Sequence, residues 1–466
     1  MSKASVVVAF VWLARTLDPG VYGDVEWALS LMMVFTLVAD VGLNTWATTE
    51  IAAKPEGAAV LVARIGWLRL TLAVPAYLLL LGIGWSRGGD ATSAVAVYGV
   101  VLFLAPLFLQ YLFNGLFQPR WAALGSALRG ITFAVAVMLL VKADSPPVHV
   151  AIAELLGATA LALCSLLVLR YVFHLRVWIR DGYRDMFHLV ARSWTIGAIE
   201  VAWSVLWYAG LILLGYLATS EDTAWHSANL RLIIALHTGV WLYFSVLLPN
   251  LARLLRHDSP GWTRTIEQSF RFTSWISCSI ALVGTLAAGT ILTTVYGPLF
   301  AAAIPELRAA IWILPVTWMS GHIRYSLIAA QHPQRDYHAA LVGVAVMLVL
   351  TLLLAPSLRS FGTGLALLAG TAANWVAAWV LGRAVLPRYR FLGNVALTGG
   401  CCLACLALGF MMTAVVGEII ATAIASFVFL TMALVRERRG LAELLRTFIG
   451  VSKPKVGSNA DADARA

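Results

Sequence analysis

The stretch LARTLDPGVYGDVEWALSLMMVFTLVADVGLNTWATTE, residues 13–50, decides the fold of this chain. An apolar run ends at Asp18-Pro19-Gly20, and a second, longer apolar run follows that contains one acidic residue, Asp40. Proline lacks an amide donor and glycine adopts the backbone angles of a tight turn, so this tripeptide separates two helices. The pattern predicts two membrane-spanning helices joined by a short turn, with Asp40 in a structural role.

The composition of the whole chain is that of a polytopic membrane protein. Of its 466 residues, 61% are hydrophobic and 12% are charged, and the mean hydropathy is +0.84. Soluble domains average about 25% charged residues. The net charge of +10 is spread between apolar runs, which is what the positive-inside rule predicts, so nucleic acid is not expected as a partner.

Window hydropathy predicts about fourteen transmembrane helices in an all-α protein. The predicted spans are 4–17, 25–45, 58–84, 91–117, 124–141, 150–173, 189–218, 228–248, 272–295, 309–330, 339–358, 362–385, 395–413 and 418–435. The first is shorter than the roughly 20 residues of a bilayer span. We therefore expect a shortened first helix, such as a start codon placed too late would produce.

Charges in the predicted loops alternate, which places both termini in the cytoplasm. The cytoplasmic loops would hold Lys54, Arg120, Arg170, Arg176, Arg180, Arg184, Arg253, Arg256, Arg264, Arg335, Arg383, Arg388, Arg390, Arg436, Arg438 and Arg439. The outer loops would hold Asp18, Asp24, Glu26, Asp90, Asp144, Glu221, Asp222, Glu306 and Glu418.

The most polar break, 175–188, divides the spans into two similar sets, as in transporters built from two related halves. We predict a six-helix bundle at 1–186 and a second at 187–387 around a central cavity. Two additional transmembrane helices would follow at 388–435, and a cytoplasmic tail at 436–466.

Several motifs resemble the polysaccharide and lipid-linked-oligosaccharide flippases, relatives of the multidrug-and-toxin-extrusion transporters. The family often shows L-A-R-x-L-x-P-x-x-Y-G, then A-D-x-G-L, then E-I-A. The matching residues here are Leu13, Ala14, Arg15, Leu17, Pro19, Tyr22, Gly23, Ala39, Asp40, Gly42, Leu43, Glu50, Ile51 and Ala52. Residues 296–308 are similar to its Y-G-x-x-F-x-x-A-x-x-x-L-R stretch. Many relatives carry an Asp in the seventh helix where this chain has Trp207-Tyr208, so a role for that Asp is not carried over.

Arginines inside the spans are the first candidates for a substrate cavity, because a charge in the hydrocarbon costs about 3 kcal/mol or more. Arg64 and Arg69 lie five residues apart in the third span, a rotation of about 140°, so they cannot face one cavity together. Arg69 is the deeper and better candidate, whereas Arg64 can extend to the headgroups. Arg129 and Arg324 are further candidates, with snorkelling or an internal ion pair as the alternative.

Glu200, Trp203 and Trp207 share one face of the seventh span by their i, i+3 and i+7 spacing. A carboxylate beside aromatic rings suits sugar stacking or a proton site. The alternative is an ion pair of Glu200 with Arg192 or Arg324, and tryptophans packed between helices.

Three polar residues are weaker cavity candidates: His237 in the eighth span, Asn114 in the fourth and Asn374 in the twelfth. Interhelical hydrogen bonding explains such residues equally well. The cysteines, Cys164, Cys278, Cys401, Cys402 and Cys405, all lie in apolar runs, and we interpret them as buried small hydrophobic residues.

The resemblance implies a flippase for an undecaprenyl-diphosphate-linked glycan in the bacterial inner membrane, with a surface-polysaccharide polymerase and export machinery as possible partners. Arginine suits a diphosphate because its guanidinium forms bidentate, charge-assisted hydrogen bonds. No G-x-x-x-x-G-K-[ST] loop occurs, so we expect no ATP hydrolysis by the chain. The resemblance implies coupling to a proton or sodium gradient, and no other cofactor is expected. Replacing Arg69 or Arg324 by Ala is expected to abolish glycan export at unchanged protein level.

Three other functions stay open. An ion-coupled drug or cation antiporter of the related extrusion family favours buried carboxylates and needs few cavity arginines. A membrane glycosyltransferase or polymerase needs a large outer loop, and every predicted outer loop is short. A membrane scaffold without transport activity is the third.

Overall fold

The computed structural model describes residues 2–174, 183, 186–388 and 390–448, and every regular element within these ranges is a helix. This confirms the predicted all-α class. The remaining residues, which include Arg176, Arg180, Arg184 and most of the polar break, lie outside the described part of the chain.

The chain before the polar break forms eight α-helices and two short 3₁₀ helices. They are α1 (Ser2–Thr16), α2 (Pro19–Asp40), α3 (Leu43–Ala53), η1 (Pro55–Gly57), α4 (Ala58–Arg87), α5 (Asp90–Leu104), η2 (Ala105–Leu107), α6 (Gln110–Gly115), α7 (Pro119–Leu140) and α8 (Pro147–Tyr171).

The chain after the break forms nine α-helices and one 3₁₀ helix. They are α9 (Phe187–Leu217), α10 (Ser220–His257), α11 (Ser259–Leu286), α12 (Ala288–Val295), η3 (Pro298–Ala303), α13 (Ile304–Ala310), α14 (Ile313–Ala329), α15 (Pro333–Gly382), α16 (Leu392–Val416) and α17 (Glu418–Phe448).

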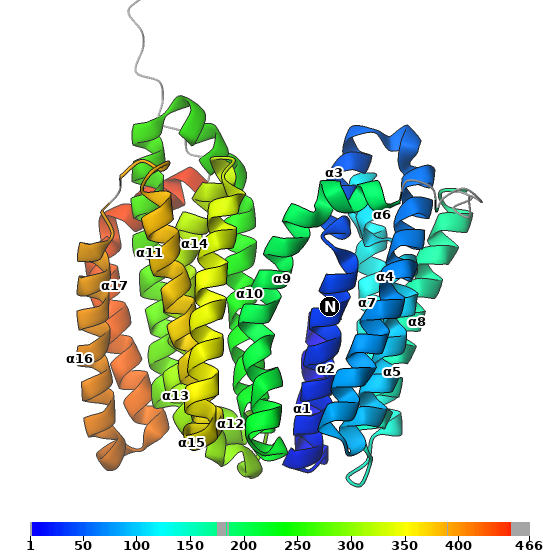
Figure 1. Cartoon of the computed structure of the whole chain (residues 1–466). Coiled ribbons are helices and arrows are strands. Elements are labelled where there is room, and N and C mark those ends of the chain that lie inside the picture. Colours follow the sequence, from blue (N-terminus) through cyan, green and yellow to red (C-terminus); the bar gives the residue numbers. More distant parts are fainter. Residues whose placement is uncertain (1, 175–182, 184–185, 389, 449–466) are drawn as a thin grey trace, which may run out of the picture.

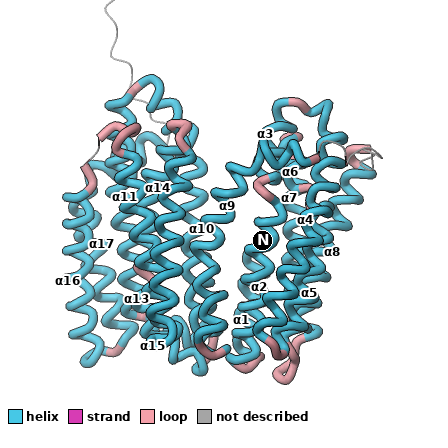
Figure 2. Tube along the Cα trace, viewed as in Figure 1, coloured by secondary structure: helices cyan, strands magenta, loops and turns pink. Residues whose placement is uncertain are grey.

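The helices form two groups that approach each other at the lower end in Figure 1 and diverge at the upper end. We call α1 to α8 the first bundle and α10 to α15 the second bundle. Helix α9 leans from the first bundle at the upper end to the second bundle at the lower end, and α16 and α17 lie on the far side of the second bundle. Loops collect at the two ends, as Figure 2 shows.

The predicted count of fourteen spans is not confirmed. Within the described residues, eleven helices are long and apolar enough to cross a membrane, or twelve if the bent pair α11 and α12 is one span. Helix α1 has only 15 residues. Helix α15 contains the eleventh predicted span and most of the twelfth, separated by Arg359, whose backbone is non-helical (φ 51°, ψ −129°). Its two halves pack closely against each other, as shown at Gly343, where an added Cβ would meet the Gly370 carbonyl.

The turn predicted at residues 18–20 is present, because α1 ends at Thr16 and α2 begins at Pro19. The Asp18 carboxylate accepts a hydrogen bond from the Gly20 amide (2.9 Å) and caps α2. At its other end α2 stops at Val41 and Gly42, both with positive φ. Glycine adopts a positive φ without steric cost, which explains its place at residue 42. A Cβ on Gly42 would also overlap the Gly197 backbone of α9.

Three acidic residues that the sequence places in outer loops are buried in helices instead. Glu26, Asp222 and Glu306 are 3%, 1% and 1% exposed. Glu306 contacts His226 (Oε1 to Nδ1, 2.5 Å), and Asp222 accepts hydrogen bonds within the capping box of α10. Hydropathy places these residues near the ends of predicted spans, but it does not show that neighbouring helices cover them.

Candidate functional site

A cavity of about 870 Å³ lies between the two bundles. Helices α1, α2, α6, α7 and α8 line it from the first bundle, and α9, α10 and α12 line it from the other side. Most of its wall is apolar, and its charged residues are Glu26, Arg129, Glu154 and Arg231. We call this space the central cavity.

Arg129 of α7 lines the central cavity and also forms the internal ion pair that the sequence left open as the alternative. Its Nε lies 3.1 Å from Glu154 Oε1 of α8, and its Nη2 contacts the same oxygen. The Arg129 side chain is 30% exposed whereas that of Glu154 is 11% exposed. The guanidinium is therefore held by a carboxylate and still open to the cavity.

Arg231 is a second cavity arginine, and sequence reasoning missed it. It extends from α10 across the gap between the bundles to Glu26 of α2, with Nε and Nη2 bound to the two carboxylate oxygens (2.5 and 2.8 Å). This bidentate geometry is the strong form of an arginine–carboxylate contact. Arg231 lies in the predicted eighth span, so the cost of a charge in the membrane would have identified it by the same argument as Arg129.

Arg324 lies at a third place, on α14 of the second bundle. Its Nε is 3.3 Å from Asp336 Oδ2, and its guanidinium lies 4.1 Å from the centre of the Trp203 ring. Trp203 Nε1 also donates to Asp336 (3.4 Å), and the Trp207 and His237 rings are 5.3 Å apart. Four predicted candidates thus form two neighbouring contacts beside α9, with Asp336 as the residue that the sequence did not single out.

Arg69, the preferred candidate from sequence, does not line the central cavity. It is 4% exposed, forms an ion pair with Asp40, and donates to the carbonyls of Ala105 (3.3 Å) and Phe108 (3.5 Å). These carbonyls are at the break between α5 and α6, where the helical pattern leaves acceptors free. The arginine therefore satisfies backbone groups and the Asp40 carboxylate, which agrees with the structural role predicted for Asp40.

Glu200 and the two tryptophans of α9 contact different parts of the protein. Its Oε1 accepts a hydrogen bond from Thr45 of the first bundle (2.7 Å), whereas Trp203 contacts residues of the second. The reason is the path of α9, which passes from one bundle to the other along its length (Figure 1). Glu200 and the two tryptophans therefore share a helix face but have different neighbours. Arg324 pairs with Asp336 rather than with Glu200.

The three remaining candidates lie away from the central cavity. Arg64 is half-buried in α4, and Asn114 is exposed in the short helix α6. Asn374 is 3% exposed in the second half of α15, where its Cβ faces Gly343 of the first half. The interhelical hydrogen bonding offered as the alternative is not seen for its amide nitrogen, because Asn374 Nδ2 is buried without a hydrogen-bond partner in the described part of the chain.

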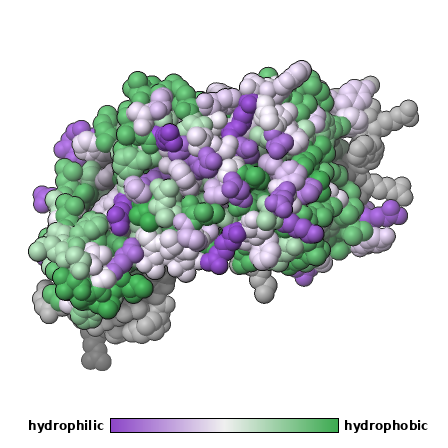
Figure 3. All heavy atoms as spheres, turned by 90° about the horizontal axis from the view of Figure 1, so that it is seen from below, coloured by the Kyte–Doolittle hydropathy of each residue, from purple (hydrophilic) through white to green (hydrophobic). Residues whose placement is uncertain are grey.

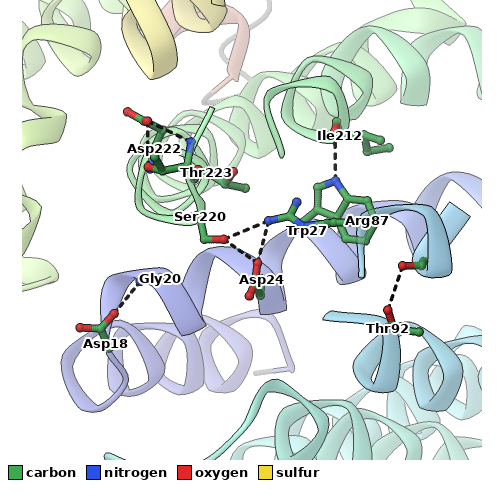
Figure 4. Close-up of polar contacts among 12 residues, drawn as sticks. Asp18, Gly20, Asp24, Trp27, Arg87, Thr92, Ile212, Ser220, Asp222 and Thr223 are labelled. Atoms are coloured by element: carbon green, nitrogen blue, oxygen red, sulfur yellow. Dashed lines mark hydrogen bonds and ion pairs between the residues drawn. The ribbon is translucent and has the colours of Figure 1, made fainter. Parts of the chain in front are cut away.

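The lower end of the central cavity is closed by contacts between the bundles. Figure 4 shows Asp24 of α2 accepting hydrogen bonds from Arg87 (2.7 Å) and from Ser220 of α10 (2.8 Å). Trp27 Nε1 donates to the Ile212 carbonyl of α9 (3.0 Å). In the view from below, Figure 3 shows hydrophilic side chains across the middle of this face.

Four of the five cysteines are buried and one, Cys401, is half-buried, which confirms the interpretation of the cysteines as packing residues. Cys402 Sγ contacts the Cys278 carbonyl (3.6 Å). Within the described part of the chain, no group of three or more His, Cys, Asp or Glu residues could hold a metal ion.

Comparisons with solved structures identify the fold. The lipid II flippase MurJ in an inward-closed conformation superposes with a TM-score of 0.73 at 11% identity, over 94% of this chain and 98% of that chain. A multidrug resistance MATE family transporter gives 0.68 inward-facing (14% identity, 82% and 94% covered) and 0.58 outward-facing (14%, 82% and 93%). A comparison with curated protein sequences finds no match.

The sequence itself matches the profile described as "Polysaccharide biosynthesis protein" over residues 4–255, which is more than half of the chain. Together with the MurJ-like and MATE-like fold, this match confirms the resemblance seen in the motifs. The chain is a multi-pass membrane protein that belongs to the polysaccharide biosynthesis protein family.

Proposed function

We propose that the chain is a flippase that moves an undecaprenyl-diphosphate-linked oligosaccharide from the inner to the outer leaflet of the bacterial cytoplasmic membrane, for surface polysaccharide biosynthesis. It works by alternating access, and both of its termini are cytoplasmic. The observation that carries this proposal is the central cavity, which is closed at the lower end and contains two arginines within a mostly apolar wall. The family match and the fold shared with the lipid II flippase support the same substrate class.

The arginines supply the chemistry that a diphosphate needs. Arg129 and Arg231 line the cavity, and Arg324 lies on the second bundle beside Trp203. Guanidinium groups bind phosphate oxygens in pairs, and a tryptophan ring offers a face on which a sugar can stack. Each arginine is at present held by a carboxylate, so the diphosphate must replace that carboxylate as partner.

The substrate and the carboxylates compete for the arginines of the cavity. The Glu154 carboxylate and the diphosphate compete for Arg129, so the ion pair opens when the substrate binds and re-forms when the substrate leaves. The same argument applies to Glu26 with Arg231. Because the sequence contains no ATP-binding loop, we propose a proton or sodium gradient as the driving force, with no other cofactor.

The central test is the flipping of a fluorescent undecaprenyl-diphosphate oligosaccharide in proteoliposomes. Arg129→Ala is expected to lower the rate by about tenfold or more, since a charge-assisted hydrogen bond contributes about 1.5–3 kcal/mol. The matched control is Arg120→Ala, which removes an exposed arginine from the upper end of the same helix. Equal rates for wild type and Arg129→Ala would contradict the proposed binding role.

An ion-coupled drug or cation antiporter is the second candidate, because the MATE transporters share this fold and Glu26 and Glu154 are buried carboxylates beside the cavity. The same proteoliposomes separate the two functions. Uptake of an organic cation against a proton gradient, with no movement of the lipid-linked glycan, would favour the antiporter. A glycosyltransferase is not supported, since the described connections at the lower end are short.

A further inference from the structure

Two adjoining cavities open at the upper end of the second bundle, apart from the central cavity. Their volumes are about 480 and 1270 Å³, and they share Glu267, Arg390 and Gly393. They lie between α11, the end of α15 and the beginning of α16, and none of their lining residues belongs to the central cavity. We call the two together the basic groove.

The smaller cavity is polar and carries an excess of positive charge. Arg264, Arg271 and Arg390 line it together with a single carboxylate, Glu267. Glu267 accepts a hydrogen bond from the backbone amide of Arg390 (2.8 Å), and Arg271 lies 3.8 Å from Glu437 of α17. Within the described ranges, Arg264 and Arg390 have no carboxylate partner for their side chains.

The larger cavity continues from this polar part along an apolar wall. Ile323, Trp379, Leu386, Phe391 and Leu392 supply the wall, and Arg383 and Arg388 stand at its edge. The Arg383 guanidinium lies 4.8 Å from the centre of the Trp379 ring. Leu392 is 67% exposed at the start of a membrane-spanning helix, so the groove opens toward the lipid side of the protein.

This arrangement matches one kind of ligand, a molecule with an anionic head and an apolar tail. Basic residues near the cytoplasmic face have a general explanation in the positive-inside rule. That rule requires only that arginines stay near the surface, as the exposed Arg253 and Arg256 do at the end of α10. That rule does not explain why five arginines surround one groove that is polar at one end and apolar at the other. Basic pockets between helices on the cytoplasmic side of a membrane bind anionic lipid headgroups.

We propose that the basic groove binds an anionic phospholipid, with its phosphate among Arg264, Arg271 and Arg390 and an acyl chain along Trp379 and Leu392. The lipid joins the second bundle to the α16–α17 pair, because the lining residues come from both. This site does not depend on the proposed transport substrate, since it shares no residue with the central cavity.

Lipid retention by the purified full-length protein tests the proposal, with native mass spectrometry as the readout. Wild type is expected to retain phosphatidylglycerol and cardiolipin in preference to phosphatidylcholine. Arg264→Gln with Arg390→Gln is expected to weaken this retention by about tenfold or more. The matched control is Arg253→Gln with Arg256→Gln, which removes the same charge from the same end and should retain the lipid.

Three results would overturn the proposal: equal loss in the control, equal retention of phosphatidylcholine, or displacement of the lipid by inorganic pyrophosphate at a similar concentration. The last result would assign the site to free phosphate groups instead of a phospholipid. A measurement on the wild-type chain guards against a variant that fails to fold. A photoreactive phosphatidylglycerol is expected to label peptides 264–271 and 390–394, and labelling confined to the end of α10 would contradict the site.

Discussion

At the lower end of the molecule the two bundles meet directly, whereas at the upper end the described contacts between them pass through α9. Below, α2 lies against the start of α10, where a Cβ on Gly23 would overlap the Ser220 carbonyl. Above, Val41 and Gly42 lie against Gly197 of α9, and Thr45 donates to Glu200. Both ends thus rely on a close approach at glycine, but among the described residues only the lower end adds ion pairs.

This difference between the two ends indicates which contacts stabilise the conformation that is closed at the lower end. The lower end combines the Arg231–Glu26 pair with the Asp24, Arg87 and Ser220 network, so opening it must break charged contacts. Among the described residues, the upper end has exposed hydrogen bonds in the corresponding place, from Thr45 to Glu200 and from Thr71 to the Met186 sulfur. Alternating access requires the lower contacts to open while the upper ends approach, and the variants below test each end.

The largest effect is expected from Gly23→Ala, which places a methyl group against the Ser220 carbonyl. Because that neighbour is backbone, the bundles must move apart at the lower end, and glycan export is expected to fall by about tenfold or more. Ser227→Cys, which lines the cavity, should then react with an impermeant thiol reagent added outside, in a background without the native cysteines.

The matched control for Gly23→Ala is Gly82→Ala, at a site in α4 where nothing lies within 4 Å of the added Cβ. This control should export normally and leave Ser227→Cys protected. Normal export by Gly23→Ala would show that close approach at this glycine is unnecessary for transport. The proposed closed lower end would then need another basis.

Next in size is the Arg231–Glu26 pair. Replacing either partner alone leaves an unpaired buried charge and is expected to lower the free energy of unfolding by about 3–5 kcal/mol. The double variant Glu26→Met with Arg231→Met should recover most of that stability, since apolar side chains can fill the same space. Thermal unfolding of the four purified proteins measures the coupling energy.

Export separates the stabilising role of this pair from its role in transport. If Arg231 binds the diphosphate, the double variant stays stable but does not export glycan. Full export by the stable double variant would limit the pair to holding the bundles together. In that case Arg129 would be the remaining cavity arginine on which the proposed function rests.

Arg69 and Arg231 show how much of this comparison the sequence could predict. Hydropathy located both arginines inside spans, because a membrane restricts long apolar runs to helices. It did not show which way each side chain points, since that depends on the helices packed around it. Arg69 is covered by Asp40 and the α5–α6 break, whereas Arg231 meets a carboxylate 205 residues away in the chain.

The same limit explains the residues placed wrongly or overlooked. Glu26 and Glu306 are near turns in the sequence, and only the packed bundles show that neighbouring helices bury them. The pair Arg129 and Glu154 joins consecutive helices, so a search for opposite charges at equal depth in neighbouring spans could have found it. The turn at residues 18–20 was predictable because proline, glycine and a capping Asp specify it locally.

A smaller effect on transport is expected from Arg69→Ala, in contrast to the complete loss of export expected from sequence alone. The structure places Arg69 in a buried contact, so its removal leaves Asp40 unpaired and should lower the protein level in the membrane. Export per molecule should stay near wild type. Asp40→Asn combined with Arg69→Ala should restore part of the protein level, measured by quantitative immunoblotting.

The smallest effect is expected at the upper end, from Thr45→Val. This change removes the exposed hydrogen bond to Glu200 at a cost of about 0.5–1.5 kcal/mol. Export should change by less than about tenfold, and a thiol at residue 227 should become somewhat more reactive from the cytoplasmic side. Asn44→Ala, which alters a neighbouring exposed side chain, is the control. If Thr45→Val lowered export as much as Gly23→Ala, contacts at the two ends would contribute equally to transport. The charged contacts of the lower end would then not explain the present conformation.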